Sequence, residues 1–290
     1  MKLEWKKASN AQSTRLHEVE GVPFLTFPKL EEAGVTHGFS TRLGGVSEGI
    51  FASMNLSYNR GDEKASVDEN YRRMGKAIGF TPDQLVFSNQ VHDTKIKIVT
   101  KEDCGKVMTG MDGLMTDEKG ICLVTSYADC VPLFFYDPVK GVVAVSHSGW
   151  KGTVNRMGKK TVEKMESVYG SKAEDIIAAI GPSICQKCYE ISEDVAIQFA
   201  DAFPEEWYDT FMVDKGNGKY QLDLWKVNEY ILLDAGILKE HLDITDLCTC
   251  CNPELLFSHR ASKGKRGNLA GFIRIKKKNE GFIDEFFINA

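Results

Sequence analysis

The stretch ICLVTSYADCVPLFFYDPVKGVVAVSHSGWKG (residues 121–152) decides the fold. It contains three apolar runs, 121–125, 133–136 and 142–145, and Asp137-Pro138 marks a turn between the last two. Short apolar runs bounded by turn residues are typical of strands that are buried on both faces. This stretch therefore predicts the core of a sheet.

The segments on either side of this stretch add further strands and helices. Strand-like patterns cover 24–27, 35–40, 85–87, 176–180, 255–258 and 269–273, and helical spacing of apolar residues covers 67–78, 154–168, 193–203 and 224–235. Gly79 and Gly170 stand where two of these helices should end. Because the strands occur in groups and do not alternate strictly with helices, we predict an α+β fold and not a doubly wound sheet.

The composition is that of an ordinary folded protein with an ample core, since 42% of the 290 residues are hydrophobic and 27% are charged. No repeat or linker interrupts the sequence, so we expect one large domain over residues 1–290. A net charge of −5 argues against a general nucleic-acid binder and favours a small-molecule substrate. We expect a cytoplasmic protein. Nothing in the sequence indicates its oligomeric state.

That cytoplasmic prediction depends on two observations. The N-terminus is charged and lacks the apolar core of a signal peptide, and no apolar stretch approaches the roughly 20 residues that span a bilayer. We therefore expect no association with a membrane. The eight cysteines are spread over a long chain, and we interpret them as reduced thiols.

Three residues with reactive or metal-binding side chains lie where apolar runs end. They are His92 in Asn-Gln-Val-His, Cys130 in Tyr-Ala-Asp-Cys, and His147 in Ser-His-Ser-Gly-Trp-Lys-Gly. Two imidazoles and one thiol can bind a metal or carry out nucleophilic catalysis. Zinc accepts both ligand types, and three protein ligands leave a fourth position for water or substrate. Spacing alone is a weak signal, because each residue can equally be a packed or hydrogen-bonded side chain.

The surroundings of His147 favour a binding site. Small residues allow a close approach of the backbone, the following helix offers free N–H groups to an anion, and Lys151 adds a positive charge. The alternative is a plain strand-to-helix turn in which Trp150 belongs to the core and Lys151 lies in solvent.

Together the motifs resemble those of the YfiH/YlmD family of laccase-domain proteins. They are His-Gly-Phe-Ser-Thr-Arg-Leu-Gly-Gly-Val-Ser (37–47), Asn-Gln-Val-His (89–92), Asp-Gly-Leu-Met-Thr-Asp (112–117), Ala-Asp-Cys-Val-Pro (128–132), His-Ser-Gly-Trp-Lys-Gly (147–152), Ile-Gly-Pro-Ser-Ile-Cys (180–185), Cys-Tyr-Glu (188–190), Phe-Ser-His-Arg (257–260) and Lys-Arg-Gly (265–267). The resemblance extends from about Thr36 to Ile275.

This resemblance implies layered mixed β-sheets flanked by helices, and a purine nucleoside phosphorylase that acts on adenosine, inosine and methylthioadenosine and also deaminates adenosine. It implies that His92, Cys130 and His147 bind one catalytic zinc, with copper as the other metal that the laccase label suggests. The chain departs from relatives at residues 261–263, where Ala-Ser-Lys replaces Arg-Asp-Gly, which weakens any role for these residues.

Phosphorolysis also requires a phosphate site. We predict that Arg42, Lys151 and Arg260 bind phosphate, because a guanidinium matches phosphate oxygens with two parallel hydrogen bonds. The alternative for each arginine is a surface ion pair. Asp129, beside Cys130, is a candidate acid/base or supporting group, and the alternative is a solvated turn carboxylate.

A rival mechanism makes Cys130 a nucleophile whose proton is taken by His147 or His92, as in cysteine hydrolases and amidases. The fold resembles that of a toxin deamidase with such a pair, and some family members are described as editing peptidoglycan precursors. A non-catalytic metal-binding role is a further alternative. Copper polyphenol oxidation is disfavoured, because a multicopper site needs many imidazoles and the chain has six histidines.

A second group of thiols, Cys248, Cys250 and Cys251, can form a cluster with the Cys-x-x-Cys pair Cys185 and Cys188. The segment Cys-Thr-Cys-Cys does not match a standard metal-binding spacing as a whole, and Cys188 is accounted for by packing within Cys-Tyr-Glu. The sequence leaves a second metal open.

Overall fold

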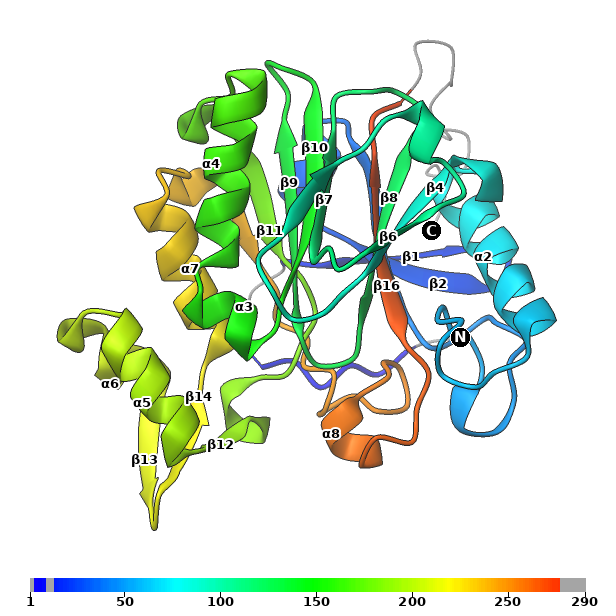
Figure 1. The fold of residues 1–290 in the computed structure, drawn as a ribbon. Coiled ribbons are helices and arrows are strands. Elements are labelled where there is room, and N and C mark those ends of the chain that lie inside the picture. The colour runs from blue at the N-terminus through cyan, green and yellow to red at the C-terminus, as the bar shows by residue number, and fades with distance from the viewer. Residues whose placement is uncertain (1–2, 9–12, 277–290) are drawn as a thin grey trace.

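Two large mixed sheets form the centre of the computed structural model, which describes residues 3–8 and 13–276 (Figure 1). The first sheet has the order β1-β2-β3-β16-β8-β4-β6. Its strands are β1 (Arg15–Val19), β2 (Val22–Thr26), β3 (Thr36–Ser40), β16 (Leu269–Arg274), β8 (Cys122–Tyr127), β4 (Leu85–Asn89) and β6 (Val107–Thr109). In it β4 runs parallel to β6 and β8, whereas β16 is antiparallel to β3 and β8.

The second sheet has the order β15-β11-β9-β10-β7-β5. Its strands are β15 (Leu242–Ile244), β11 (Ile177–Ile180), β9 (Val131–Asp137), β10 (Val142–Ser148), β7 (Gly113–Thr116) and β5 (Ile96–Ile98). A small sheet, β12-β14-β13, lies apart from both and consists of β12 (Glu190–Ser192), β14 (Lys219–Leu222) and β13 (Met212–Gly216).

Helices cover the outer faces of the two large sheets (Figure 1). The helices are α1 (Pro28–Glu32), α2 (Lys64–Ile78), α3 (Trp150–Val154), α4 (Met157–Tyr169), α5 (Glu193–Ala202), α6 (Tyr208–Phe211), α7 (Leu224–Asp234) and α8 (His259–Ser262). Of these, α5 and α6 lie beside the small sheet. On the first sheet, Tyr71 and Met74 of α2 belong to one cluster with Val124 and Phe272. On the second sheet, α4 and α7 provide the cover.

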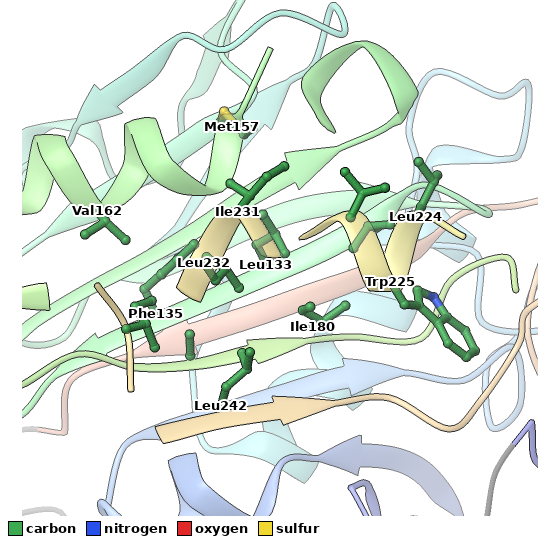
Figure 2. Close-up of a cluster of buried hydrophobic side chains, with 14 of the residues drawn as sticks. Leu133, Phe135, Met157, Val162, Ile180, Leu224, Trp225, Ile231, Leu232 and Leu242 are labelled. Carbon is green, nitrogen blue, oxygen red and sulfur yellow. The ribbon is translucent and has the colours of Figure 1, made fainter. Parts of the chain in front are cut away.

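Strand β9 explains why the central run of sequence is continuously apolar. Leu133 and Phe135 point toward the helices and pack with Ile231 and Leu232 of α7 (Figure 2). Phe134, on the opposite face, belongs to the cluster that fills the space between the two sheets. Since side chains alternate between the faces of a strand, a strand covered on both sides needs apolar residues at every position.

The predicted α+β class and the layered sheets flanked by helices are confirmed. The three apolar runs of the central stretch correspond to β8, β9 and β10. Helices α2 and α4 end at Gly79 and Gly170, which adopt φ angles of 96° and 66° that glycine tolerates best. None of the eight cysteines is in a disulfide bond in the structure, and their state as reduced thiols stays a prediction.

Two predicted elements were wrong. The single helix expected over 154–168 is divided into α3 and α4, because Arg156 adopts a left-handed backbone with φ of 58°. The strand expected over 255–258 is a turn that leads into α8. Its residues Leu256 and Phe257 are buried between the sheets, so their apolar character reflects burial and not strand formation.

The single-domain assignment over 1–290 stays a prediction, and residues 1–2, 9–12 and 277–290 of that range lie outside the described residues. Within the described part of the chain, no helix combines the length and the apolar character that crossing a membrane requires.

The two sheets approach each other closely where Gly271 of β16 faces Phe134. A Cβ atom at position 271 would lie 2.7 Å from Cζ of Phe134 and 3.3 Å from Cε2 of Tyr127. We therefore expect Gly271→Ala to lower the free energy of unfolding by about 1–3 kcal/mol through overpacking. Urea unfolding measures the change.

Phe134→Leu should relieve this clash, so the double variant should be less destabilised than the sum of the two single variants. Val139→Ala, at an exposed position, is the control and should leave stability within about 0.5 kcal/mol of the parent. Additive effects of Gly271→Ala and Phe134→Leu would contradict the proposed contact.

Candidate active site

His92, Cys130 and His147 lie close together, on segments from both large sheets. His92 follows β4 of the first sheet, Cys130 lies where the chain passes from β8 to β9, and His147 belongs to β10 of the second sheet. One potential ligand atom from each residue lies within 4.8 Å of the other two. Cys130 Sγ is 4.0 Å from His92 Nε2, and the two imidazole ring centres are 4.9 Å apart.

Asp112 holds two members of this trio. Its fully buried carboxylate accepts hydrogen bonds from the backbone N–H groups of Val91, His92 and Asp93, each at 3.0 Å. The left-handed backbone of His92, with φ of 62°, fits the way in which successive N–H groups converge on one anion. The other contact of Asp112 Oδ1 is His147 Nδ1 at 2.9 Å. Asp112 therefore connects the loop after β4 to strand β10.

This contact also determines which nitrogen of His147 is available. With Nδ1 donating to Asp112, Nε2 is left to accept a proton or bind a metal. Burial alone would raise the pKa of the Asp112 carboxyl, but the hydrogen bonds from His147 and the backbone keep that pKa below its usual value. Asp112 is therefore a carboxylate that orients an imidazole.

Cys130 and His147 favour each other's charged forms. Burial would raise the pKa of the Cys130 thiol, but the nearby His147 lowers that pKa below the usual range. Burial would lower the pKa of the His147 imidazole, but the Cys130 thiolate and Asp112 raise it. A thiolate at position 130 suits both metal binding and nucleophilic attack.

Gly149 leaves space beside the trio. A Cβ atom there would lie 3.0 Å from Cys130 Sγ and 3.2 Å from His92 Cδ2. The glycine in Ser-Gly-Trp-Lys-Gly therefore allows the start of α3 to approach all three side chains. A close approach of this backbone to a bound ligand, which the small residues favour, stays a prediction.

Asp129 is a buried support, and the alternative of a solvated turn carboxylate was wrong. Its carboxylate accepts hydrogen bonds from Thr249 Oγ1 at 2.6 Å and from the backbone N–H of Arg260 at 2.6 Å. These bonds anchor the residue that precedes Cys130 to the segment 249–260. An acid/base role for Asp129 stays a prediction.

Arg42, a predicted phosphate ligand, is held by the backbone of two loops, and phosphate binding by its guanidinium stays a prediction. Its Nε and Nη2 donate to the carbonyl of Ala52, Nη1 donates to the carbonyl of Pro253, and the guanidinium lies 4.7 Å from the centre of the Phe257 ring. Five donors are available on a guanidinium, and these bonds direct three of its nitrogens toward the backbone. Arg42 thus holds two loops together.

The other two predicted phosphate ligands lie at the surface. Lys151 is exposed, and its Nζ lies 5.6 Å from the Trp150 ring centre. Arg260 is exposed, donates to the carbonyls of Cys188 and Glu190 at 3.1 Å, and stacks over Tyr189. Phosphate binding by either residue stays a prediction.

Two functional candidates were not singled out from the sequence. Asp112 and Arg266 were noted only as parts of the motifs at 112–117 and 265–267. Arg266 Nη1 donates to the carbonyl of Gly267 and to Oδ1 of Asn268, whereas Nε is buried and has no hydrogen-bond partner in the described part of the chain. Burial and the charge of Arg60 lower the pKa of Arg266 to about 10, against the opposing influence of Asp129 and Cys130. The only signal in the sequence was a charged residue within a motif, because the charged groups that act on Arg266, such as Arg60 and Asp129, are far away in sequence.

The donor set of the trio fits a metal. Two imidazoles and a thiol that favours its thiolate form are the ligands that zinc prefers, and Asp112 supports one of them as carboxylates do at zinc sites. His92 is exposed to solvent, so the group is accessible from one side. Three ligands with an accessible side can hold an ion and leave a position for a substrate.

Comparison with known proteins gives consistent results. Residues 36–276 match the family model "Multi-copper polyphenol oxidoreductase laccase". Purine nucleoside phosphorylase YlmD of Bacillus subtilis is 38% identical over 250 residues, which cover 84% of this chain and 89% of that protein. A purine nucleoside phosphorylase of Deinococcus radiodurans is 38% identical and covers 89% of this chain and 95% of its own.

A solved structure supports the same relationship. The crystal structure of Bacillus licheniformis hypothetical protein YfiH aligns with a TM-score of 0.86 at 33% identity, over 92% of this chain and 100% of that one. The sheets and helices described above are therefore shared with a protein of related sequence.

Asp112 supplies the charge that orients His147, which leads to a test. We expect Asp112→Asn to weaken zinc binding at the trio about 10- to 100-fold, because the amide lacks that charge and presents N–H donors to the backbone N–H groups. Calorimetric titration measures the affinity. Cys130→Ser, which removes a ligand, identifies the part of the titration that belongs to the trio.

Asp93→Asn is the matched control. Asp93 lies in the same loop, but its carboxylate accepts from the N–H of Thr94 and pairs with Lys95, so zinc affinity should stay at the parent value. Equal losses in the Asp112 and Asp93 variants would contradict the orienting role of Asp112.

Proposed function

The chain belongs to the multi-copper polyphenol oxidoreductase laccase family, and on that premise we propose that it is a zinc-dependent purine nucleoside phosphorylase. Relatives that carry that activity in their names are 38% identical over more than four fifths of this chain. The proposed substrates are adenosine, inosine and methylthioadenosine together with phosphate, and adenosine deamination is proposed as a second activity of the same site. We propose a cytoplasmic enzyme with no nucleic-acid or membrane partner.

The observation that carries the proposal is the trio with its orienting carboxylate. His92, Cys130 and His147 come within 4.8 Å of one another, and Asp112 directs Nε2 of His147 toward them. A zinc ion bound there supplies a Lewis acid at neutral pH. His92 is exposed and Cys130 is half-buried, so the group is open to solvent on one side.

The residues around the trio prepare it for an anionic substrate. Asp129 and its bonds to Thr249 and Arg260 position the backbone beside Cys130. Arg266 and Arg260 lie on the same segment as these contacts, and Lys151 follows His147 at the start of α3. All three guanidinium nitrogens of Arg42 donate to backbone carbonyls, whereas only the two Nη atoms of Arg260 do so in the described part of the chain. We therefore propose that Arg266, Arg260 and Lys151 supply the positive charge that holds phosphate.

A second candidate function rests on the same contacts. Asp112, His147 and Cys130 form the series of carboxylate, imidazole and thiol in which a base is oriented by an acid and activates a nucleophile. This arrangement supports a cysteine hydrolase or amidase that acts on peptidoglycan precursors. The two functions differ in whether Cys130 is bound to a metal or free to attack, because a zinc-bound thiolate is a poorer nucleophile.

Product analysis separates these functions. The protein, purified without added metal, is incubated with adenosine and phosphate before and after treatment with a chelator. We expect adenine and ribose 1-phosphate, with inosine and ammonia as minor products, and we expect chelation to stop their formation and zinc to restore it.

Cys130→Ser and His147→Ala should both abolish this turnover. Chelator-resistant cleavage of an amide that iodoacetamide blocks would instead establish the thiol enzyme. A trio that binds zinc while the protein turns over neither a nucleoside nor an amide would contradict both enzymatic functions and leave a metal-binding role.

Arg266 and Arg42 make a matched pair for the phosphate site. We expect Arg266→Ala to raise the KM for phosphate about 10- to 100-fold, the equivalent of one lost charge-assisted hydrogen bond of about 1.5–3 kcal/mol. Arg42→Ala should lower stability to unfolding while the KM for phosphate stays unchanged, because its bonds go to Ala52 and Pro253. Steady-state kinetics at varied phosphate, with urea unfolding, measures both effects. The reverse result would return Arg42 to the phosphate site.

A further inference from the structure

Four cysteines from two distant segments meet outside the trio. Cys185 and Cys188 flank a short turn before β12, and Cys248 and Cys251 lie in the turn that follows Leu247. One sulfur from each lies within 4.8 Å of the other three. We propose that these four thiolates bind one zinc ion as a structural site, separate from the trio.

The spacing of the sulfur atoms fits one tetrahedral ion. Zinc–sulfur bonds of about 2.3 Å place the sulfurs of a tetrahedral site about 3.8 Å apart. Here Cys185 Sγ is 3.9 Å and Cys188 Sγ is 3.4 Å from Cys251 Sγ. A four-iron cluster holds its cysteine sulfurs much farther apart than this group does. The four sulfurs are thus arranged for a single ion before any ligand reorientation.

The two pairs share a spacing that the sequence analysis did not recognise. Cys185 and Cys188 form a Cys-x-x-Cys pair, and so do Cys248 and Cys251 once Cys250 is left out. Two such pairs on separate turns are the usual ligand set of a structural zinc site. The three closely spaced cysteines at 248, 250 and 251 concealed the second pair, because sequence alone does not say which of them faces the first pair.

The backbone around Cys248 is arranged to stabilise a thiolate. The N–H of Cys185 donates to Cys248 Sγ at 3.2 Å, and the N–H of Cys251 donates to the same sulfur at 3.4 Å. Hydrogen bonds of this kind orient metal ligands and offset their charge. Cys248 is fully buried, so a thiolate at this position needs both these donors and a cation. A disulfide bond between Cys188 and Cys251 would use only one pair and leave Cys248 and its donors without a role.

The group has a route for an ion. A cavity of about 510 Å³ is lined by Cys185 and Cys251 together with Lys187, Asp223 and Trp225. Figure 2 shows Trp225 at the start of α7, and its Nε1 donates to Ser183 Oγ at 2.6 Å. The trio does not line this cavity. A metal can therefore reach the four cysteines without passing the candidate active site.

A metal at this group would join the two segments that support Asp129. Thr249, next to Cys248, donates to Asp129, and the carbonyl of Cys188 accepts from Arg260. The chain near Cys130 is therefore held by the segments that the four thiolates cross-link. The metal site itself does not depend on the proposed function, but its effect on turnover does.

The test counts zinc in protein purified without added metal. Elemental analysis and native mass spectrometry of the parent chain should find two zinc ions, one for each group of ligands. Cys130→Ser should retain one ion, and Cys248→Ser should lose the other. Cobalt loaded into the Cys130→Ser variant should give the intense thiolate-to-metal absorption of a tetrahedral site with several sulfur ligands.

Cys250→Ser is the matched control, because Cys250 lies in the same turn but outside the four-cysteine group. It should keep both zinc ions. If Cys248→Ser does not fold, an organomercurial titrated into the Cys130→Ser protein should release its remaining zinc as four thiols react. These readouts do not use catalysis, so an inactive protein with this zinc would reject the proposed function and retain the site.

Three results would overturn the proposal. They are a single zinc that disappears in Cys130→Ser, a zinc content unchanged by Cys248→Ser, and a mass two hydrogens lower than expected that identifies a Cys188–Cys251 disulfide in protein without the second ion.

Discussion

The buried carboxylate of Asp112 is the interaction on which the candidate site depends. A carboxylate removed from water needs partners for its charge, and here three backbone N–H groups and one imidazole provide them. Two of these partners come from residues that belong to the trio, one following the first sheet and one in the second. Satisfying one buried charge thus brings His92 and His147 together.

The same principle operates on the other side of Cys130. Asp129 has little contact with solvent, and its two oxygens take hydrogen bonds from Thr249 and from the backbone of Arg260. Two buried carboxylates, Asp112 and Asp129, therefore fix the segments that surround the Cys130 thiol. Asp112 binds the segments of His92 and His147, and Asp129 binds Thr249 and Arg260. The four-cysteine group lies on the segments that bond to Asp129 through Thr249 and to Arg260 through Cys188. Its proposed metal is thereby connected to the geometry of the site.

Local pattern was sufficient for much of the fold. Continuous apolar runs predicted β8, β9 and β10 because these strands are covered on both faces, and helical spacing with a terminal glycine predicted α2. The sequence pattern gave wrong secondary structure where tertiary contacts set the course of the backbone. Arg156 divides a helix through its left-handed backbone and contacts Phe203, and Leu256 and Phe257 fill the core from a turn.

By itself, the sequence determined the fold class, the family motifs and the three residues of the trio, since hydrophobic pattern and residue type are local properties. Tertiary structure decided the roles that depend on distant partners. It assigned Arg42 to backbone carbonyls, identified Asp112 as the partner of His147, and selected Cys251 over Cys250 to face the first cysteine pair. The physical reason is that hydrogen bonding and metal coordination require atoms within a few ångströms, and separation along the chain does not specify that distance.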